Sequence, residues 1–357
     1  MLQPIRVGVV GTSWWADMHH LPTLKRHPGA ALTAICGRNR DRAEAMAHKY
    51  AIPHVFTDYR AMIEEGNLHA LVVVTPDDLH FAITMHALDA NLHVLCEKPL
   101  ALTAGQARSM YEKAEAGGRK HMVLFTYRWL PQYRYARQLI DAGYIGRCFH
   151  CQIRYVAGYG RAGQYGWRFD RQRSNGILGD LGSHMIDLAR WYVGDVAKVS
   201  GHLATFVERP GADGAVLDPA NDAALLAVEF ANGAQGTIQV SAVAHVGDRG
   251  QEQQVILHGE EGTLEIDLNF TSAEIRGARY DEERIGTLPV PDGLWGDADR
   301  SDLFALLFAN SAATQQFIDA IAEDRIVAPT FYDGWKVQEV IDAALESHQI
   351  GCWVSIP

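Results

Sequence analysis

The segment Ile5-Arg6-Val7-Gly8-Val9-Val10-Gly11-Thr12-Ser13-Trp14-Trp15-Ala16 joins a short β-rich run to the start of a predicted helix. A strand that ends at a glycine and passes directly into a helix is the pattern that opens a doubly wound α/β domain. In the spacing G-x-G-x-x-G/A, Gly11 makes the tight turn, Ser13 stands where a second glycine is usual, and Ala16 packs the helix against the strand. The start of such a helix favours phosphate groups. The candidate residues for a dinucleotide are therefore Gly11, Thr12, Ser13 and Trp14.

The same alternation of strand and helix continues to about residue 125. Apolar strands are predicted at 31–36, 71–74 and 91–96, and helices at 41–50, 81–90 and 103–116. Strands separated by single helices pair in parallel through right-handed crossovers, with helices on both faces. We therefore expect a Rossmann domain, a doubly wound parallel sheet, over residues 1–125.

The pattern changes after residue 125 to a succession of strands with fewer helices. Strands are predicted at 149–156, 197–206, 223–230, 234–243, 253–258 and 263–268, and helices at 131–141, 185–193, 312–323 and 334–347. Runs of strands with helices to one side indicate an α+β domain. We expect residues 126–357 to form a substrate-binding and oligomerisation domain on a large, open, mainly antiparallel sheet.

Composition excludes several classes of protein. The chain has 357 residues, 48% of them hydrophobic and 21% charged, with a formal net charge of −11. These values exclude disorder and coiled coil, and a sequence pI near 5.8 argues against a nucleic-acid partner. No apolar run approaches the ~18 residues that suggest a membrane helix. The start lacks the pattern of a signal peptide, so we expect a cytoplasmic protein.

The cysteines indicate neither a disulfide framework nor a metal site. Cys148 and Cys151 have the spacing of half a zinc or redox site, but no second pair of ligands accompanies them. Residues 149–155 alternate as in a strand, so we interpret both cysteines as small apolar side chains and expect no metal.

The end of the second predicted strand bears on which dinucleotide binds. An acidic residue there usually holds the ribose 2′-hydroxyl of NAD, but this chain reads Cys36-Gly37-Arg38-Asn39-Arg40. Arg38 offers a positive fork for the 2′-phosphate of NADP, or a flat surface for adenine. The missing acid favours NADP.

Other motifs carry groups suited to proton and hydride chemistry. Thr75-Pro76-Asp77-Asp78-Leu79-His80 and Glu97-Lys98-Pro99 follow the third and fourth predicted strands, where ligands bind in this architecture. In the second domain, Asp180 and His184 are four residues apart and share one face of a helical turn. A neutral histidine can take an alcohol proton while a carboxylate orients it, although the same pair also fits a helix cap beside a packed histidine.

Taken together, these motifs resemble those of the glucose–fructose oxidoreductase / inositol dehydrogenase / MocA-like (Gfo/Idh/MocA) family. The resemblance rests on their order along essentially the whole chain: Gly11-Thr12-Ser13, Thr75-Pro76 with His80, Glu97-Lys98-Pro99, Gly176 to Asp187, and Pro329 to Gly334. It implies an NAD(P)-dependent oxidoreductase that acts on a secondary alcohol or ketone of a sugar, polyol or cyclic sugar derivative. It also implies subunits paired into homodimers or homotetramers.

The resemblance assigns a role to each matching residue. Lys98, Asp180 and His184 would be catalytic, with His184 the general acid/base, and the Lys98–Pro99 peptide would be cis. Thr75, Pro76, His80, Glu97 and Lys98 would line the cofactor, and Trp167-Arg168 resembles a pair that reaches the cofactor in some relatives. Substrate contacts would come from Lys98, Tyr127, Tyr155, Asp180 and His184.

Two alternatives to a dehydrogenase remain on the same scaffold. One is an NAD-assisted glycosidase or lyase that oxidises its sugar transiently and returns the hydride. The other is a cofactor-binding regulator without chemistry, against which the joint presence of Lys98, Asp180 and His184 argues. The sequence names neither the sugar nor the physiological direction.

Overall fold

A computed structural model describes residues 3–212, 215–296, 299–308 and 312–357. Contacts between Cα atoms divide the chain into two compact units. Unit 1 contains residues 1–125 and 308–335, and unit 2 contains residues 126–307 and 336–357.

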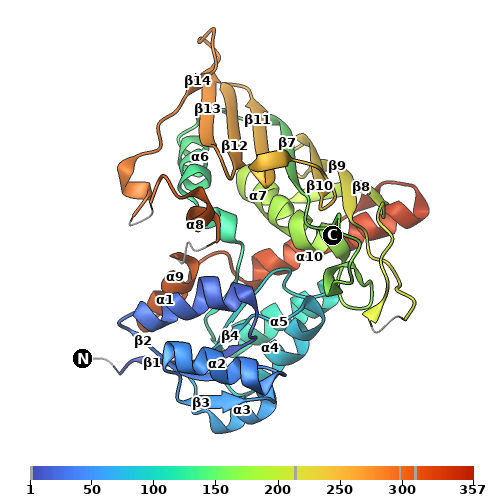
Figure 1. The fold of residues 1–357 in the computed structure, drawn as a ribbon. Helices are drawn as coiled ribbons and strands as arrows, with labels where there is room; N and C mark the ends of the chain where they lie inside the picture. The colour runs from blue at the N-terminus through green and yellow to red at the C-terminus, as the bar shows by residue number, and fades with distance from the viewer. Residues whose placement is uncertain (1–2, 213–214, 297–298, 309–311) are drawn as a thin grey trace. The chain divides into compact units, whose positions relative to one another are not determined.

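Unit 1 is built on a six-stranded parallel sheet with the order β3-β2-β1-β4-β5-β6 (Figure 1). Its strands are β1 (Ile5–Val10), β2 (Ala30–Cys36), β3 (His54–Phe56), β4 (Ala70–Val73), β5 (His93–Cys96) and β6 (His121–Val123). The central strands β1 and β4 are apolar and buried, because helices cover both faces of a parallel sheet. The Rossmann fold predicted from the sequence is confirmed.

Unit 1 contains helices that connect its strands and one, α9, from the later segment of the chain. They are α1 (Leu21–Arg26), α2 (Arg40–Tyr50), α3 (Tyr59–Glu65), α4 (His80–Asp89), α5 (Ala104–Ala116) and α9 (Ala312–Ala322). Short polar side chains cap several helix starts, as when Asn39 accepts a hydrogen bond from the Arg42 backbone N–H (2.9 Å). A π-helix at Ala16–His20 precedes α1, in which Pro22 stands in the first turn, where proline is tolerated.

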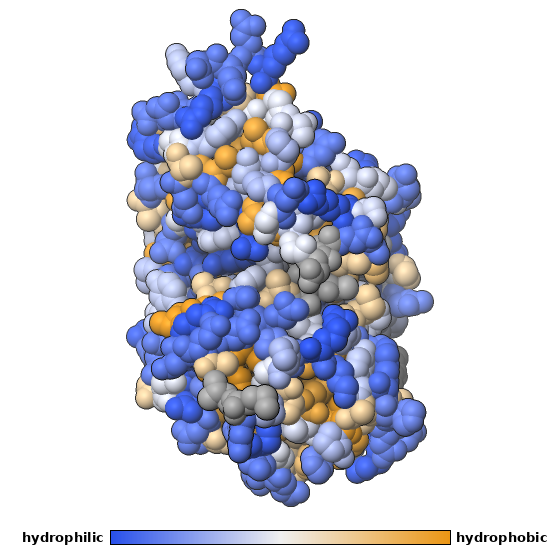
Figure 2. Space-filling view, turned by 90° about the vertical axis from the view of Figure 1, so that its left-hand side faces the viewer, coloured by the Kyte–Doolittle hydropathy of each residue, from blue (hydrophilic) through white to orange (hydrophobic). Residues whose placement is uncertain are grey.

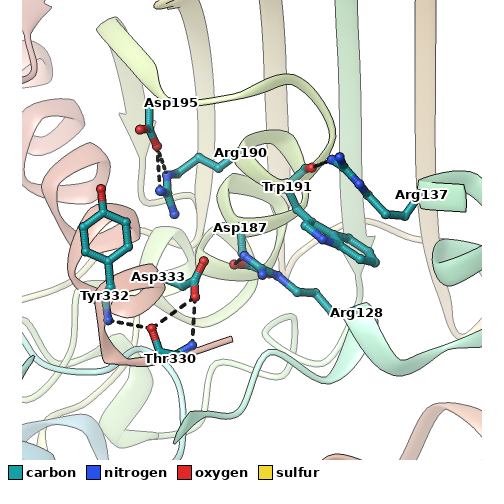
Figure 3. Close-up of polar contacts among 9 residues, drawn as sticks. All are labelled: Arg128, Arg137, Asp187, Arg190, Trp191, Asp195, Thr330, Tyr332 and Asp333. Atoms are coloured by element: carbon teal, nitrogen blue, oxygen red, sulfur yellow. Dashed lines mark hydrogen bonds and ion pairs between the residues drawn. The ribbon is translucent and has the colours of Figure 1, made fainter. Parts of the chain in front are cut away.

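The segment 308–335 belongs to unit 1, although the sequence placed it with the second domain. His20 Nδ1 lies 3.1 Å from Thr314 Oγ1, and His27 Nε2 lies 3.1 Å from Asp319 Oδ1. The segment ends at the start of α10 (Phe331–Ile350), where the Asp333 carboxylate accepts from the Thr330 N–H at 2.8 Å (Figure 3). These contacts join residues about 290 positions apart, so they have no local signature in the sequence.

Unit 2 is built on a nine-stranded sheet with the order β14-β13-β12-β11-β7-β10-β9-β8-β15. Its strands are β7 (Cys148–Ala157), β8 (Val196–Ala204), β9 (Ala223–Phe230), β10 (Gln235–Ser241), β11 (Gln251–Gly259), β12 (Gly262–Asn269), β13 (Ala273–Arg279), β14 (Gly286–Thr287) and β15 (Val354–Ser355). The β7–β10 pair is parallel and the other pairs are antiparallel. The predicted α+β domain with a mainly antiparallel sheet is confirmed.

Helices pack on one face of this sheet. They are α6 (Pro131–Asp141), α7 (Ser183–Val193) and the part of α10 after residue 335, and most of the short helix α8 (Leu303–Phe308) also belongs to unit 2. Buried and more exposed residues alternate along β11, because one side of the strand faces the helices and the other does not. The surface in Figure 2 is mostly hydrophilic, with separate apolar patches. In the described residues, no helix is long and apolar enough to cross a membrane.

Candidate active site

The glycine turn of unit 1 has the conformation that its sequence predicts. Gly11 has φ +126°, and a Cβ at this position would lie 2.1 Å from the Val74 carbonyl oxygen, so glycine is required. Ser13 Oγ accepts a hydrogen bond from the Ala16 N–H (3.2 Å) and so caps the helix that follows. The Ser13 hydroxyl keeps its own proton for donation to a ligand. Trp14, in the same turn, is 50% exposed.

The residue after β2 is packed against this turn. A Cβ on Gly37 would lie 2.5 Å from Thr12 Cγ2 and 2.9 Å from Thr12 Oγ1, so the side chain of Thr12 fills the space beside Gly37. Arg38 is exposed, and no hydrogen bond or ion pair engages its guanidinium among the residues that the structure describes. Beside the glycine turn, residues 37–40 after β2 therefore present a cation and contain no acidic residue, although the Asp58 carboxylate after β3 acts electrostatically on Cys36 at the end of β2.

Polar groups gather at the carboxyl ends of β4 and β5, which are neighbouring strands. Thr75 Oγ1 is buried and has no hydrogen-bond partner in the described part of the chain. His80 is fully buried, and its two ring nitrogens lie 2.8 Å from the Pro99 carbonyl oxygen and 3.0 Å from the Thr75 carbonyl oxygen. The Lys98–Pro99 peptide bond is cis, as the resemblance implies.

The Glu97 carboxylate forms its hydrogen bonds with other residues of unit 1. It accepts hydrogen bonds from Trp15 Nε1 and from His20 Nε2, the latter at 2.9 Å. Burial raises the pKa of this carboxyl, but the hydrogen bond from His20 and nearby positive charges outweigh that effect and hold the pKa below its usual value. The Glu97 side chain therefore ties the turn after β5 to the helix after β1, a role that the sequence did not reveal.

In unit 2, Asp180 lies in a π-helix at Leu178–Gly182 and His184 lies in the first turn of α7. Both are buried, at 8% and 6% exposure. Asp180 Oδ2 accepts a hydrogen bond from the Tyr159 hydroxyl (2.6 Å) and forms an ion pair with Arg168 Nε (3.0 Å). Arg168 and Asp180 therefore meet, although the sequence assigned one to the cofactor and the other to catalysis.

Aromatic side chains surround Asp180 and His184. The Tyr127 ring lies 4.5 Å from the His184 ring, and the Tyr127 hydroxyl donates to the Tyr155 hydroxyl (2.9 Å), which donates to Gln251 Oε1 (2.8 Å). Burial and the neighbouring Tyr155 raise the pKa of Tyr127, so both phenols remain protonated donors. The Arg168 guanidinium lies 4.4 Å from the Trp167 ring. Tyr127, Tyr155, Trp167 and Arg168 thus belong to one polar and aromatic cluster with Asp180 and His184.

A buried ion pair anchors the same region (Figure 3). Arg128 donates from Nε to Asp187 Oδ2 (2.8 Å) and from its terminal nitrogen to Asp187 Oδ1 (2.6 Å). Arg128 follows Tyr127, and Asp187 lies three residues after His184, so the pair fixes the backbone beside both. Its members stand inside the sequence motifs, but a pairing 59 residues apart has no signature in one sequence.

The residues present fit a nicotinamide dinucleotide. The glycine turn, the Ser13 hydroxyl, the Arg38 cation and the Thr75 hydroxyl all lie at the carboxyl-end loops of β1, β2 and β4. In an open α/β sheet, this is the edge where such ligands bind. Among the described residues, no group of three or more His, Cys, Asp or Glu side chains could hold a metal ion.

Comparisons with known proteins agree with this architecture. Residues 5–125 match the oxidoreductase family with an NAD-binding Rossmann fold, and residues 133–265 match the GFO/IDH/MocA C-terminal domain. Levoglucosan dehydrogenase of Pseudarthrobacter phenanthrenivorans is 29% identical over 100% of this chain and 99% of its own. The scyllo-inositol 2-dehydrogenase (NAD(+)) of Bacillus subtilis is 28% identical over 79% of this chain and 80% of its own. A levoglucosan dehydrogenase structure in complex with NADH and levoglucosan superposes with a TM-score of 0.88 at 29% identity, covering 99% of this chain and 100% of that one.

Proposed function

The chain belongs to the GFO/IDH/MocA family of NAD-binding oxidoreductases. We propose that it transfers a hydride between nicotinamide and a secondary alcohol of a cyclic sugar. The observation that carries the proposal is the buried His184, four residues after an Asp180 carboxylate held by Tyr159 and Arg168. This arrangement supplies a proton acceptor and a fixed negative charge near it.

Residues of unit 1 would hold the cofactor. Gly11, Thr12, Ser13 and Trp14 form the phosphate turn, and Thr75, Pro76, His80, Glu97 and Lys98 belong to the turns after β4 and β5. When bound, the nicotinamide accepts a hydride from the alcohol carbon or returns it to the ketone. Glu97 would act indirectly, because its carboxylate is engaged by Trp15 and His20.

Side chains of the protein would accept and return the proton of the reacting hydroxyl. As the alcohol C–H bond gives up its hydride, the O–H proton passes to His184 and the carbon–oxygen bond becomes a carbonyl. Lys98 would donate a hydrogen bond to the same oxygen and stabilise the negative charge that develops there. Asp180 would hold His184 in orientation or bind a second hydroxyl. The reverse sequence reduces the ketone.

A cyclic sugar is the substrate class that the surroundings of His184 support. Aromatic rings of Tyr127, Tyr155 and Trp167 offer flat faces to ring carbons, and the hydroxyls of the tyrosines offer hydrogen bonds. The named relatives act on levoglucosan and scyllo-inositol, which are cyclic polyols. Which sugar this chain oxidises is open to a substrate panel.

We further propose that NADP is preferred to NAD. Arg38 is exposed, and no described residue forms a hydrogen bond or ion pair with its guanidinium. A 2′-phosphate would be a suitable partner for this group. Thr12 occupies the space into which a side chain at position 37 would extend, so the residue after β2 cannot be a ribose-binding acid without repacking Thr12. The levoglucosan dehydrogenase structures contain NADH, so on this point we expect the present chain to differ from that relative.

A panel of pyranosides, anhydrosugars and inositols with NAD and with NADP tests the proposed function. Reduced nicotinamide that accumulates together with a keto-sugar supports a dehydrogenase. Glycoside cleavage without net cofactor reduction would instead identify the glycosidase or lyase alternative. Binding of the dinucleotides without turnover of any sugar would favour a regulator.

We also propose that the protein is a cytoplasmic homodimer or homotetramer. The face of the unit 2 sheet opposite α6 and α7 includes a groove of about 350 Å³, lined in part by His150, Gln152, Thr237 and Trp353. An uncovered sheet face favours pairing with a second copy. Light scattering after size exclusion should give twice or four times the 39.4 kDa chain mass, and a monomer at micromolar concentration would contradict this.

A further inference from the structure

His80 lies at the start of α4 and is fully buried. Its Nδ1 atom lies 2.8 Å from the Pro99 carbonyl oxygen, and its Nε2 atom lies 3.0 Å from the Thr75 carbonyl oxygen. Both distances are those of ordinary hydrogen bonds. One ring therefore bridges the backbones of two separate turns, the turn after β4 and the turn after β5.

The chemistry of these partners determines the protonation of the ring. A carbonyl oxygen can only accept a hydrogen bond, so each ring nitrogen must donate. A neutral imidazole carries one N–H, and its bare nitrogen would direct a lone pair at a carbonyl lone pair. Only the imidazolium, with a proton on both nitrogens, satisfies both contacts.

The bridged carbonyls flank the residues that matter for the proposed chemistry. Pro99 directly follows Lys98, and Thr75 directly precedes Pro76. Because β4 and β5 are adjacent and parallel, the two turns leave the same edge of the sheet. On the other side of Lys98, the Glu97 carboxylate is held by Trp15 and His20. Lys98 is thus fixed from both neighbours in the chain.

We propose that His80 is a positioning residue, a buried imidazolium that ties the carbonyls of Thr75 and Pro99 together and so fixes the turn that carries Lys98. The importance of that turn rests on the proposed function, in which Lys98 contacts the reacting oxygen. The bridge itself does not depend on which sugar is oxidised.

The surroundings of the ring are consistent with a cation. Burial opposes the charge, but the Cys96 sulfur and the two carbonyls favour it more strongly, and together they raise the pKa of His80 to about 9. Cys96 faces the ring from the end of β5. The adjoining turns also contain Asp77 and Asp78 before α4, and Glu97 and Lys98 after β5.

Three variants distinguish the effects of the positive charge on His80, of its two hydrogen bonds and of the Cys96 sulfur. His80→Phe keeps a ring of similar size and removes both donors. His80→Gln carries two N–H groups on one amide and no charge, so it retains the chance to bridge. Cys96→Ala removes the sulfur and leaves the ring.

Nuclear magnetic resonance of the full chain, labelled with ¹⁵N at histidine and free of ligand, tests the protonation state. His80→Gln identifies the His80 signals by their loss. We expect both ring nitrogens to carry protons at pH 7 and to lose one only near pH 9, and at a lower pH in Cys96→Ala. A ring with one unprotonated nitrogen at pH 7 would overturn the inference. This readout needs no turnover, so it stands even if the proposed function fails.

Hydrogen exchange and kinetics test the positioning role. In His80→Phe we expect amide exchange at residues 96–101 to accelerate about tenfold or more, with His80→Gln closer to the parent and β2 of unit 1 unchanged as the control for unfolding of that unit. We expect kcat to fall about 10- to 100-fold in His80→Phe and no further when Lys98 is already alanine. Unchanged exchange at 96–101, or equal loss of kcat with and without Lys98, would contradict the proposal.

Discussion

At the scale of single residues, the proposed chemistry divides between groups that touch the reacting hydroxyl and groups that hold them. His184 and Lys98 belong to the first kind. The second kind includes Asp180, whose carboxylate is held by Tyr159 and Arg168. It also includes His80, whose ring bridges two backbone carbonyls. Substitutions of the two kinds should therefore differ in what they change.

His184→Ala and Lys98→Ala should each lower kcat/KM by about 10²- to 10⁴-fold, because each removes a group that handles the proton or charge of the hydroxyl. Dinucleotide affinity should persist in His184→Ala, since His184 lies in unit 2. Steady-state kinetics and fluorescence titration with the reduced cofactor check both statements. Parent-like turnover in either variant would remove that residue from the mechanism.

Arg38→Ala should lower kcat/KM for NADP about 10- to 100-fold and change that for NAD little, because only NADP has the 2′-phosphate. Arg60→Ala, at an exposed position in α3, is the matched control. An equal loss with both dinucleotides would indicate that Arg38 packs on adenine. Gly37→Asp should favour NAD only when Thr12→Ala also makes room for it.

At the scale of elements, the sequence predicted most of the long strands and helices, but it missed the seven-residue strand β13 and the helix α3 as well as the shortest and most unusual elements. The alternating or apolar runs of β1, β9 and α6 carry their own periodicity. The three-residue β3 and the two-residue β14 and β15 are too short to show one. The π-helices at Ala16–His20 and Leu178–Gly182 differ from α-helices only by a shift of hydrogen-bond partner, which single residues do not signal.

The site shows the same division. The order of the motifs pointed to these segments, and unit 2 brings Tyr127, Tyr155, Arg168 and Asp180 into one cluster with His184. The partners that hold the motifs, such as Trp15 for Glu97 and Arg128 for Asp187, lie tens of residues away. Only the fold establishes such pairs.

Breaking the Arg128–Asp187 pair should destabilise unit 2 strongly. Asp187→Asn leaves a buried guanidinium without its charge partner, and we expect a loss of about 3–5 kcal/mol in the free energy of unfolding. The control is Asp218→Asn, since Asp218 pairs with Arg171 at the surface, where the two side chains are 53% and 62% exposed, and its loss should cost at most about 1 kcal/mol. Urea unfolding measures both, and equal losses would contradict the account of this pair.

At the scale of the whole molecule, two units with different tasks are fused in one chain that crosses between them at residues 125, 307 and 335. Unit 1 carries the glycine turn and the other residues proposed to bind the dinucleotide, and unit 2 carries the proposed acid/base pair. The net charge of −11 is carried by the surface as a whole, while Arg38 and Lys98 stand at the two strand ends proposed for an anionic cofactor.

Acid should destabilise unit 1 through two histidines with lowered pKa values, the half-buried His93 and the fully buried His19. Burial and the nearby Arg119 and Lys120 lower the pKa of His93 to about 4, and burial lowers that of His19 to about 3. Below pH 6.5 these histidines bind protons in the unfolded chain but stay neutral in the folded one. Their contribution to the free energy of unfolding is therefore fully present above pH 6.5 and is lost as the pH falls toward 4.

For His93 this loss is at most about 3 kcal/mol when complete, because water partly screens the half-buried ring. Thermal unfolding from pH 7 to pH 4 should show a smaller decline in His93→Gln than in the parent, with His48→Gln, exposed on α2, as the control. An identical decline in all three proteins would contradict this explanation.

In the proposed reaction, a hydride leaves a sugar carbon and arrives on nicotinamide. Its most direct test uses the best substrate of the panel with deuterium on the carbon that is oxidised, and follows the label by mass spectrometry. We predict one deuterium on each reduced nicotinamide, a keto-sugar in equal amount, and loss of both products in His184→Ala. Deuterium that stays in the sugar or passes to water, with no reduced nicotinamide, would contradict the claim.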